Sequence, residues 1–245
     1  MAGRRLLLAA LLVFLLTVLW RLPAAWVLAN PTAGLQCTSP YGSLWHGGCA
    51  QLRVGPVTLD DVSWQLHPAA LLALRLDADL RSADARAPGS ARVSLGTGNR
   101  VSVTDLRADA PLDSGFLPLF PAGWSGALHL DLDSVEYAAG TITALQGTVS
   151  VQSLQQRSPL LALGSYVLQF ADAPRADGVV RGTLRDSGGP LDVNGTLEIR
   201  AAGQYELNGT VLARDTADPE FGRSLQYLGA PDAQGRRPFS LAGSF

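Results

Sequence analysis

Residues 35–68 read LQCTSPYGSLWHGGCAQLRVGPVTLDDVSWQLHP and carry a strong structural pattern. The stretch holds the only two cysteines of the chain, Cys37 and Cys49, on either side of a glycine-rich segment. Further on, Val62, Trp64 and Leu66 alternate with polar residues, as in a strand that buries one face and exposes the other. We therefore expect a hairpin with the cysteines on facing strands, followed by a further strand, as the start of a β-sheet.

The same two-residue period recurs along the rest of the chain. It is clearest in residues 74–81 and 128–133, where leucines alternate with charged and polar residues. Weaker strands are expected at residues 92–95, 100–104, 148–151, 166–170, 179–184, 191–193, 197–200, 205–207 and 210–213. With 26 glycines and 15 prolines, the pattern predicts a mainly β fold: an antiparallel curved sheet or sandwich of about twelve short strands, joined mostly as meanders.

One or two short helices are expected between the strands. Residues 67–72, with Pro68 near their start, fit one or two helical turns. Residues 218–220 are Asp-Pro-Glu, which is a helix start. Three apolar residues then fall on one helical face before Gly229 ends the helix. We expect this second helix to cap an open end of the sheet.

Gly-Thr dipeptides punctuate the second half of the chain. Asn194-Gly195 and Asn208-Gly209 each precede a threonine and have the composition of hairpin turns. A glycine can also lie inside a strand that bends or bulges. The sequence alone leaves both interpretations open.

A faint internal repeat accompanies this pattern. Residues 45–47 are Trp-His-Gly and residues 124–126 are Trp-Ser-Gly, and each triplet opens a predicted pair of strands. Two strand modules divided near residues 105–121 would explain the repeat. Chance similarity between two β-rich halves is the rival explanation.

The composition argues against a nucleic-acid-binding surface. The chain has 245 residues, of which 47% are hydrophobic, so it can bury a core. Its formal net charge is -2, and all 19 basic residues are arginines that do not cluster on one element. A basic patch, which nucleic-acid binding requires, is not apparent.

The N-terminal segment is expected to anchor the chain in a membrane. Residues 6–29 are almost entirely apolar, and as a helix they would be about 36 Å long, enough to cross a hydrocarbon core of about 30 Å. Arg4 and Arg5 place residues 1–5 in the cytoplasm by the positive-inside rule. The competing interpretation is a signal peptide cleaved after Ala29. In either case residues 30–245 form an exported domain, which is periplasmic in a Gram-negative cell.

In an exported domain, Cys37 and Cys49 are expected to form a disulfide. It would close a small loop and contribute about 3 kcal/mol in the chain-entropy model. The alternative is a metal or redox site that uses His46 with Cys49, but metal sites need three or four ligands. The nearby Trp45 and Trp64 are expected to fill the core, the alternative being an exposed contact for a partner or a lipid chain.

We expect no catalytic, cofactor-binding or metal-binding site. Residues 123–126, Gly-Trp-Ser-Gly, resemble a nucleophile elbow, but Ala127 takes the place of the closing glycine. Asp131 and Asp133 share a strand face that the alternation predicts to be solvated. A pocket with two or more convergent polar side chains would be needed to restore an enzymatic interpretation.

The order and spacing of several short motifs resemble the type II secretion system protein N family. Residues 42–47, Gly-Ser-Leu-Trp-His-Gly, are similar to the family's Gly-Thr-hydrophobic-Trp-x-Gly. Ser43 stands where the family often has threonine, and Ala73 where a glycine commonly follows a Leu-Leu pair. The matching positions are Gly42, Leu44, Trp45, Gly47, Trp64 and Pro68, together with the closing segment 235–245.

The resemblance implies an accessory component of the inner membrane, with one membrane helix and a periplasmic β-rich domain. It would scaffold or bridge other secretion components during export of folded proteins across the outer membrane, with no catalytic residues and no cofactor. The chain also resembles the AsmA-like envelope proteins, whose curved sheets carry an apolar groove for lipid. A closed sandwich would favour the scaffold, and an open curved sheet with a continuous apolar floor would favour lipid contact.

Overall fold

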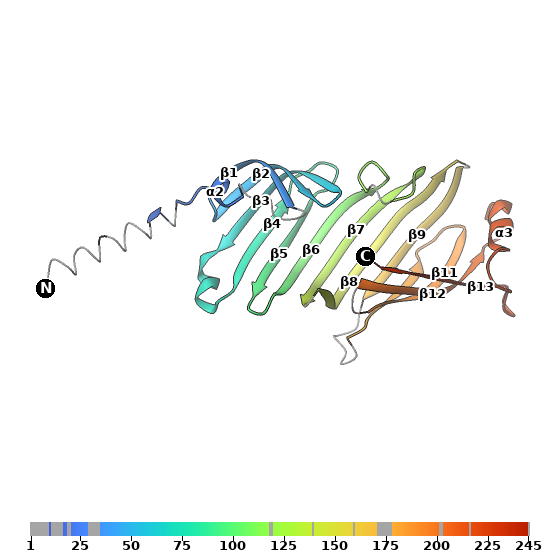
Figure 1. Ribbon diagram of the computed structural model, residues 1–245. Coiled ribbons are helices and arrows are strands. Elements are labelled where there is room, and N and C mark those ends of the chain that lie inside the picture. Colours follow the sequence, from blue (N-terminus) through green and yellow to red (C-terminus); the bar gives the residue numbers. More distant parts are fainter. Residues whose placement is uncertain are drawn as a thin grey trace.

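The chain folds into one large antiparallel sheet. The computed structural model describes residues 10, 17–18, 21–28, 35–117, 120–138, 140–158, 160–170, 178–200, 203–215 and 217–244. Within them, thirteen strands lie side by side in sequence order, from β1 to β13 (Figure 1). Each strand pairs with the next one along the chain, so the topology is a simple meander and the sheet keeps two edges, β1 and β13.

The elements have the following bounds. The strands are β1 Leu35–Gly42, β2 His46–Val54, β3 Val57–His67, β4 Leu76–Ser82, β5 Gly89–Gly96, β6 Arg100–Leu112, β7 Trp124–Ala138, β8 Thr141–Arg157, β9 Leu160–Phe170, β10 Val180–Asp186, β11 Leu191–Ile199, β12 Gln204–Ala213 and β13 Arg237–Ser244. The short helices are α2 Ala24–Leu28, the 3-10 helix η1 Pro68–Ala73, and α3 Pro219–Leu225.

The predicted membrane segment at residues 6–29 lies mostly outside the described residues, and so do Arg4 and Arg5. Among the residues that are described, no helix is long and apolar enough to cross a membrane. Residues 21–28 are described and lie against the sheet, where the N–H of Leu44 donates to the carbonyl oxygen of Leu22 at 2.9 Å. The membrane anchor and its orientation therefore stay predictions.

Strand pairing gives the sheet one apolar and one polar face. Leu106 on β6 lies opposite Leu132 on β7, and at the next position Arg107 lies opposite Asp131. The Arg107 guanidinium bonds the Asp131 carboxylate at 3.1 Å on the exposed side. Because side chains point alternately to the two faces of a strand, the two-residue period of the sequence becomes two chemically distinct surfaces.

The sheet buries much of its apolar face by itself. Figure 1 shows the strand direction turning between β9 and β13. One cluster consists of buried residues from β7 to β11, each at most 8% exposed: Leu132, Leu145, Phe170, Val180 and Ile199. A second cluster joins β9, β11 and β12 to Phe221 of α3. The apolar face is therefore closed to solvent at these positions and is not a continuous open floor.

The two predicted short helices are present. η1 begins at Pro68, and the carboxylate of Asp218 caps α3 by accepting a hydrogen bond from the N–H of Glu220 at 2.8 Å. α3 ends at Leu225, one turn earlier than the sequence predicts, and turns lead on to Gly229. Through Phe221, α3 covers one end of the apolar face, as expected for a capping helix.

Some expectations differ from the structure in detail. The described residues form thirteen strands, and of the two expected architectures they adopt the single sheet. Gly195 and Gly209 are not turn residues, because they lie opposite each other inside β11 and β12. β6 and β7 pair with each other, so the sheet runs uninterrupted through residues 105–121; a division into two modules there stays a prediction.

Gly209 has no room for a side chain. A Cβ at this position would meet the carbonyl oxygen of Asn194 and would lie 2.7 Å from Cζ of Phe239 and 2.9 Å from the Cα of Gly195. We expect Gly209→Ala to lower the free energy of unfolding by about 1–3 kcal/mol, because overpacking forces the strands apart. Urea unfolding of the full-length protein measures the change. Gly222→Ala in α3 is the control, since no atom lies within 4 Å of the added Cβ; equal losses in both variants would contradict the prediction.

Candidate functional site

The motif residues predicted from the sequence meet at the turn between β1 and β2, except for Pro68, which begins η1. The N–H of Ser43 donates to the carbonyl oxygen of His46 at 2.9 Å and closes a two-residue turn. Gly42 precedes this turn with a φ of 77°, in the region that favours glycine. A Cβ at Gly42 would meet the His46 carbonyl group. The glycine of the motif is therefore required by the backbone of the turn.

Two tryptophans hold this turn against β3. The indole Nε1 of Trp64 donates to the carbonyl oxygen of Leu44 at 3.0 Å. The N–H of Leu66 donates to the carbonyl oxygen of Trp45 at 2.8 Å. A Cβ at Gly47 would lie 2.7 Å from the Trp64 ring, so the glycine lets the indole lie against β2. Trp45 is buried and Trp64 half-buried, in agreement with a packing role.

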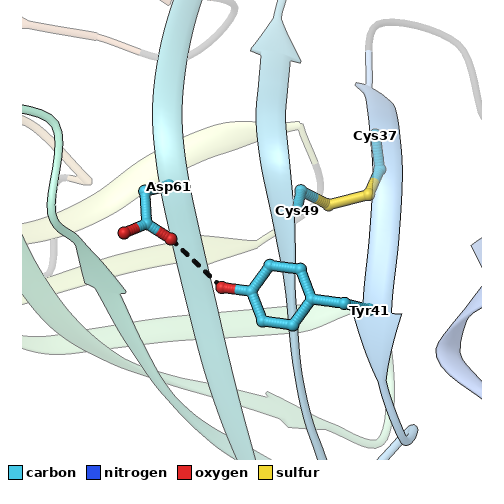
Figure 2. Close-up of a disulfide and its surroundings, with 4 residues drawn as sticks. All are labelled: Cys37, Tyr41, Cys49 and Asp61. Carbon is cyan, nitrogen blue, oxygen red and sulfur yellow. Dashed lines mark hydrogen bonds between the residues drawn. A yellow bond between two sulfur atoms is a disulfide. The ribbon is translucent and has the colours of Figure 1, made fainter.

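The two cysteines form the predicted disulfide between β1 and β2 (Figure 2). Their Cα atoms are 5.6 Å apart. The cysteines are not directly opposite, because Cys37 pairs with Leu52 and Cys49 with Pro40. The disulfide occupies Cys49, so this residue is not a thiolate ligand beside His46. Within the described ranges, no group of three or more His, Cys, Asp or Glu residues could hold a metal ion.

Tyr41 connects the β1–β2 hairpin to β3, because its side chain reaches from β1 across β2. Figure 2 shows its ring crossing β2, and its hydroxyl donates to the Asp61 carboxylate at 3.1 Å. A Cβ at Gly48 would meet the Tyr41 ring, so this glycine makes the crossing possible. Burial and the hydrogen bond to Asp61 raise the pKa of Tyr41. Paired glycines inside a strand are the sequence signal that could have revealed this crossing.

Asp84 continues the network into the loop between β4 and β5. Its buried carboxylate accepts hydrogen bonds from the N–H groups of Asp60, at 3.0 Å, and Arg86, at 2.8 Å. The N–H of Ala83 also donates to the carbonyl oxygen of Asp61 at 3.0 Å. Burial alone would raise the pKa of Asp84, but these hydrogen bonds to the carboxylate outweigh it and lower the pKa below its usual value.

An apolar cavity of about 260 Å³ lies beneath this unit. It is lined by α2 and β1 to β4, and its walls include Ala24, Leu44, Trp64 and both halves of the disulfide. None of the lining residues is charged or carries a hydroxyl group. The cavity therefore offers no side chain for acid–base or nucleophilic chemistry.

A polar hollow of about 670 Å³ lies on the opposite face, across β3 to β7. Two ion pairs between β6 and β7 lie in this hollow, Arg107 with Asp131 and His129 with Asp109. These side chains are more than a third exposed. A site open to water weakens the electrostatic stabilisation on which catalysis depends, so the hollow has the character of a solvated strand face.

Comparison with known proteins identifies a family and individual proteins that are similar to the chain. A profile of the family described as "Type II secretion system (T2SS), protein N" matches residues 33–240. The chain is 30% identical to the type II secretion system protein N of Vibrio cholerae over 86% of its own length and 85% of that protein. It is 27% identical to the protein of that name from Aeromonas hydrophila, covering 97% and 96% of the two chains. No solved structure matches the chain.

The disulfide should contribute measurably to stability. We expect the double variant Cys37→Ala and Cys49→Ala to lose about 3 kcal/mol of unfolding free energy, because its unfolded chain is no longer restrained. Urea unfolding with and without a reducing agent measures this. The reducing agent should destabilise the unmodified protein to a similar extent and leave the double variant unchanged. An unmodified protein that is insensitive to reduction would contradict the prediction.

Asp84 should make the fold sensitive to acid. Because its folded pKa is below the unfolded value, its contribution is present above about pH 4 and is lost as the pH falls through the folded pKa. We expect Asp84→Asn to cost about 1–3 kcal/mol at neutral pH and to flatten the loss of stability in acid. Thermal unfolding as a function of pH measures both effects. Asp133→Asn, at an exposed position on β7, is the control and should leave the pH profile unchanged.

Proposed function

This chain belongs to the type II secretion system protein N family, and from that membership we propose that it is an accessory, non-enzymatic component of the secretion apparatus. In this proposal it scaffolds or bridges other secretion components while folded proteins pass from the periplasm across the outer membrane. The observation that carries the proposal is the family match over residues 33–240, which takes in nearly the whole sheet.

We infer that the chain is held in the inner membrane by one helix within residues 6–29, with residues 30–245 in the periplasm. The apolar N-terminal segment and Arg4 and Arg5 support this placement. The disulfide between Cys37 and Cys49 is in keeping with an oxidising compartment.

The proposed partners are other type II secretion components in the cell envelope. A broad sheet whose strands are hydrogen-bonded to their neighbours suits a bridging role, because a partner that is already ordered loses little conformational entropy on binding. The comparisons do not favour the AsmA-like alternative with lipid in an apolar groove. The burial of the apolar face in the two clusters from β7 to β12 also argues against a continuous groove.

Gene deletion tests the proposed role directly. In the deletion strain we expect the substrates of the secretion system to reach the periplasm normally, to fold there, and to appear outside the cell at a several-fold lower level. Immunoblots of periplasmic and extracellular fractions measure the distribution. Expression of the unmodified chain from a plasmid should restore export. Unchanged export in the deletion strain would contradict the proposal.

A further inference from the structure

One turn at an end of the sheet exposes three leucines to solvent. Leu71, Leu72 and Leu74 in and after η1 are 43, 92 and 75% exposed. Leu74 ends this helix with a φ of 54°, a left-handed conformation that costs free energy in a residue other than glycine. We call residues 71–74 the leucine turn. A protein gains no stability of its own by holding three large apolar side chains in water, so the turn points to an apolar contact.

The leucine turn lies at the end of the sheet where the N-terminal segment joins it. Leu22 accepts a hydrogen bond from the N–H of Leu44 in the β1–β2 turn. The next residue of that turn, Trp45, accepts one from the N–H of Leu66. η1 begins two residues later at Pro68. A short series of backbone contacts thus connects residues 21–28 to the leucine turn.

Other exposed apolar side chains gather at the same end. Leu95 is exposed beside the turn, since it pairs with Leu76 at the start of β4. Tyr137 is exposed where β7 reaches this end, opposite Val101. Leu160 is exposed at the opposite end of the sheet, but no described turn there presents three large apolar residues together.

We propose that the leucine turn inserts into the periplasmic surface of the membrane that holds the N-terminal segment. The inference rests on the membrane anchor in the proposed function and adds a second contact with the bilayer. The predicted span extends to Ala29, yet Leu22 and Pro23 already contact the β1–β2 turn. Because these contacts lie within the predicted span, this end of the sheet lies at the bilayer surface. Apolar side chains at such a surface bury themselves among the acyl chains.

Two contacts of different kinds would then fix the sheet relative to the membrane. The anchor alone would leave the sheet and its N-terminal segment free to tilt relative to the bilayer plane. Insertion of Leu72 and Leu74 restricts this tilt, because these side chains lie on the β3–β4 connection and not on the anchor itself. The orientation of the whole sheet then follows from its own structure.

Lipid-dependent fluorescence quenching tests the insertion. The full-length chain carrying Leu72→Cys is labelled with an environment-sensitive fluorophore and reconstituted into phosphatidylcholine vesicles with doxyl-labelled phosphatidylcholine. The native cysteines do not react, because they form the disulfide. Leu160→Cys is the matched control, since Leu160 is 77% exposed at the opposite end. We expect a blue-shifted emission and several-fold stronger quenching at position 72 than at position 160.

The outcomes separate this proposal from the anchor on which it rests. Alkaline extraction of the same vesicles tests the anchor independently. A chain that resists extraction but shows equal quenching at both positions would overturn the membrane contact of the leucine turn alone. A chain that is extracted would overturn the anchor and this proposal together. A label at position 72 that lipid does not quench in vesicles, but that is protected from solvent in cells, would assign the turn to a protein partner and overturn the proposal.

Discussion

The structure depends on one constraint: a single-layer sheet has to bury its own apolar face. The alternation of apolar and polar residues gives each of the thirteen strands one apolar side, and within the described part of the chain no second sheet covers it. Because the sheet curves, its apolar face packs against itself, and Leu132, Phe170 and Ile199 from distant parts of the chain form one buried cluster. Hydrophobic burial is the dominant favourable contribution to folding, and here it also determines the shape of the sheet.

A meander of this kind leaves two edge strands, and different features limit further strand pairing at each of them. Ser39 has a φ of 52° and interrupts the pairing of β1, and the following Pro40 has no N–H to offer. Pro23 forms a β-bridge to Ser43, so the N-terminal segment covers one end of the same edge. These features prevent another strand from pairing with β1. At the other edge, Pro238 removes a donor near the start of β13.

The strands could be predicted from the sequence because their period is local, but the tertiary details could not. A curved sheet and a sandwich have the same alternation, so only long-range contacts distinguish them. Gly195 has the sequence of a turn residue, and its place inside β11 depends on the close approach of β12. Asp61 has a φ of 50° inside β3, without a distinctive local sequence. The buried carboxylate of Asp84 accepts a hydrogen bond from the N–H of Asp60, which is far away in the sequence. No spacing rule predicts that contact.

The first hairpin, formed by β1 and β2, is central because it contacts both the neighbouring part of the sheet and the N-terminal segment. The disulfide, the Tyr41–Asp61 hydrogen bond and the Asp84 carboxylate join β1, β3 and the β4–β5 loop. The exposed ion pairs on the polar face contribute little by comparison, because solvent screens them. Residues 21–28 contact this same hairpin through Leu44 and Ser43. A sheet joined to its N-terminal segment by backbone contacts keeps a fixed orientation to that segment, whereas one joined by a flexible linker would not.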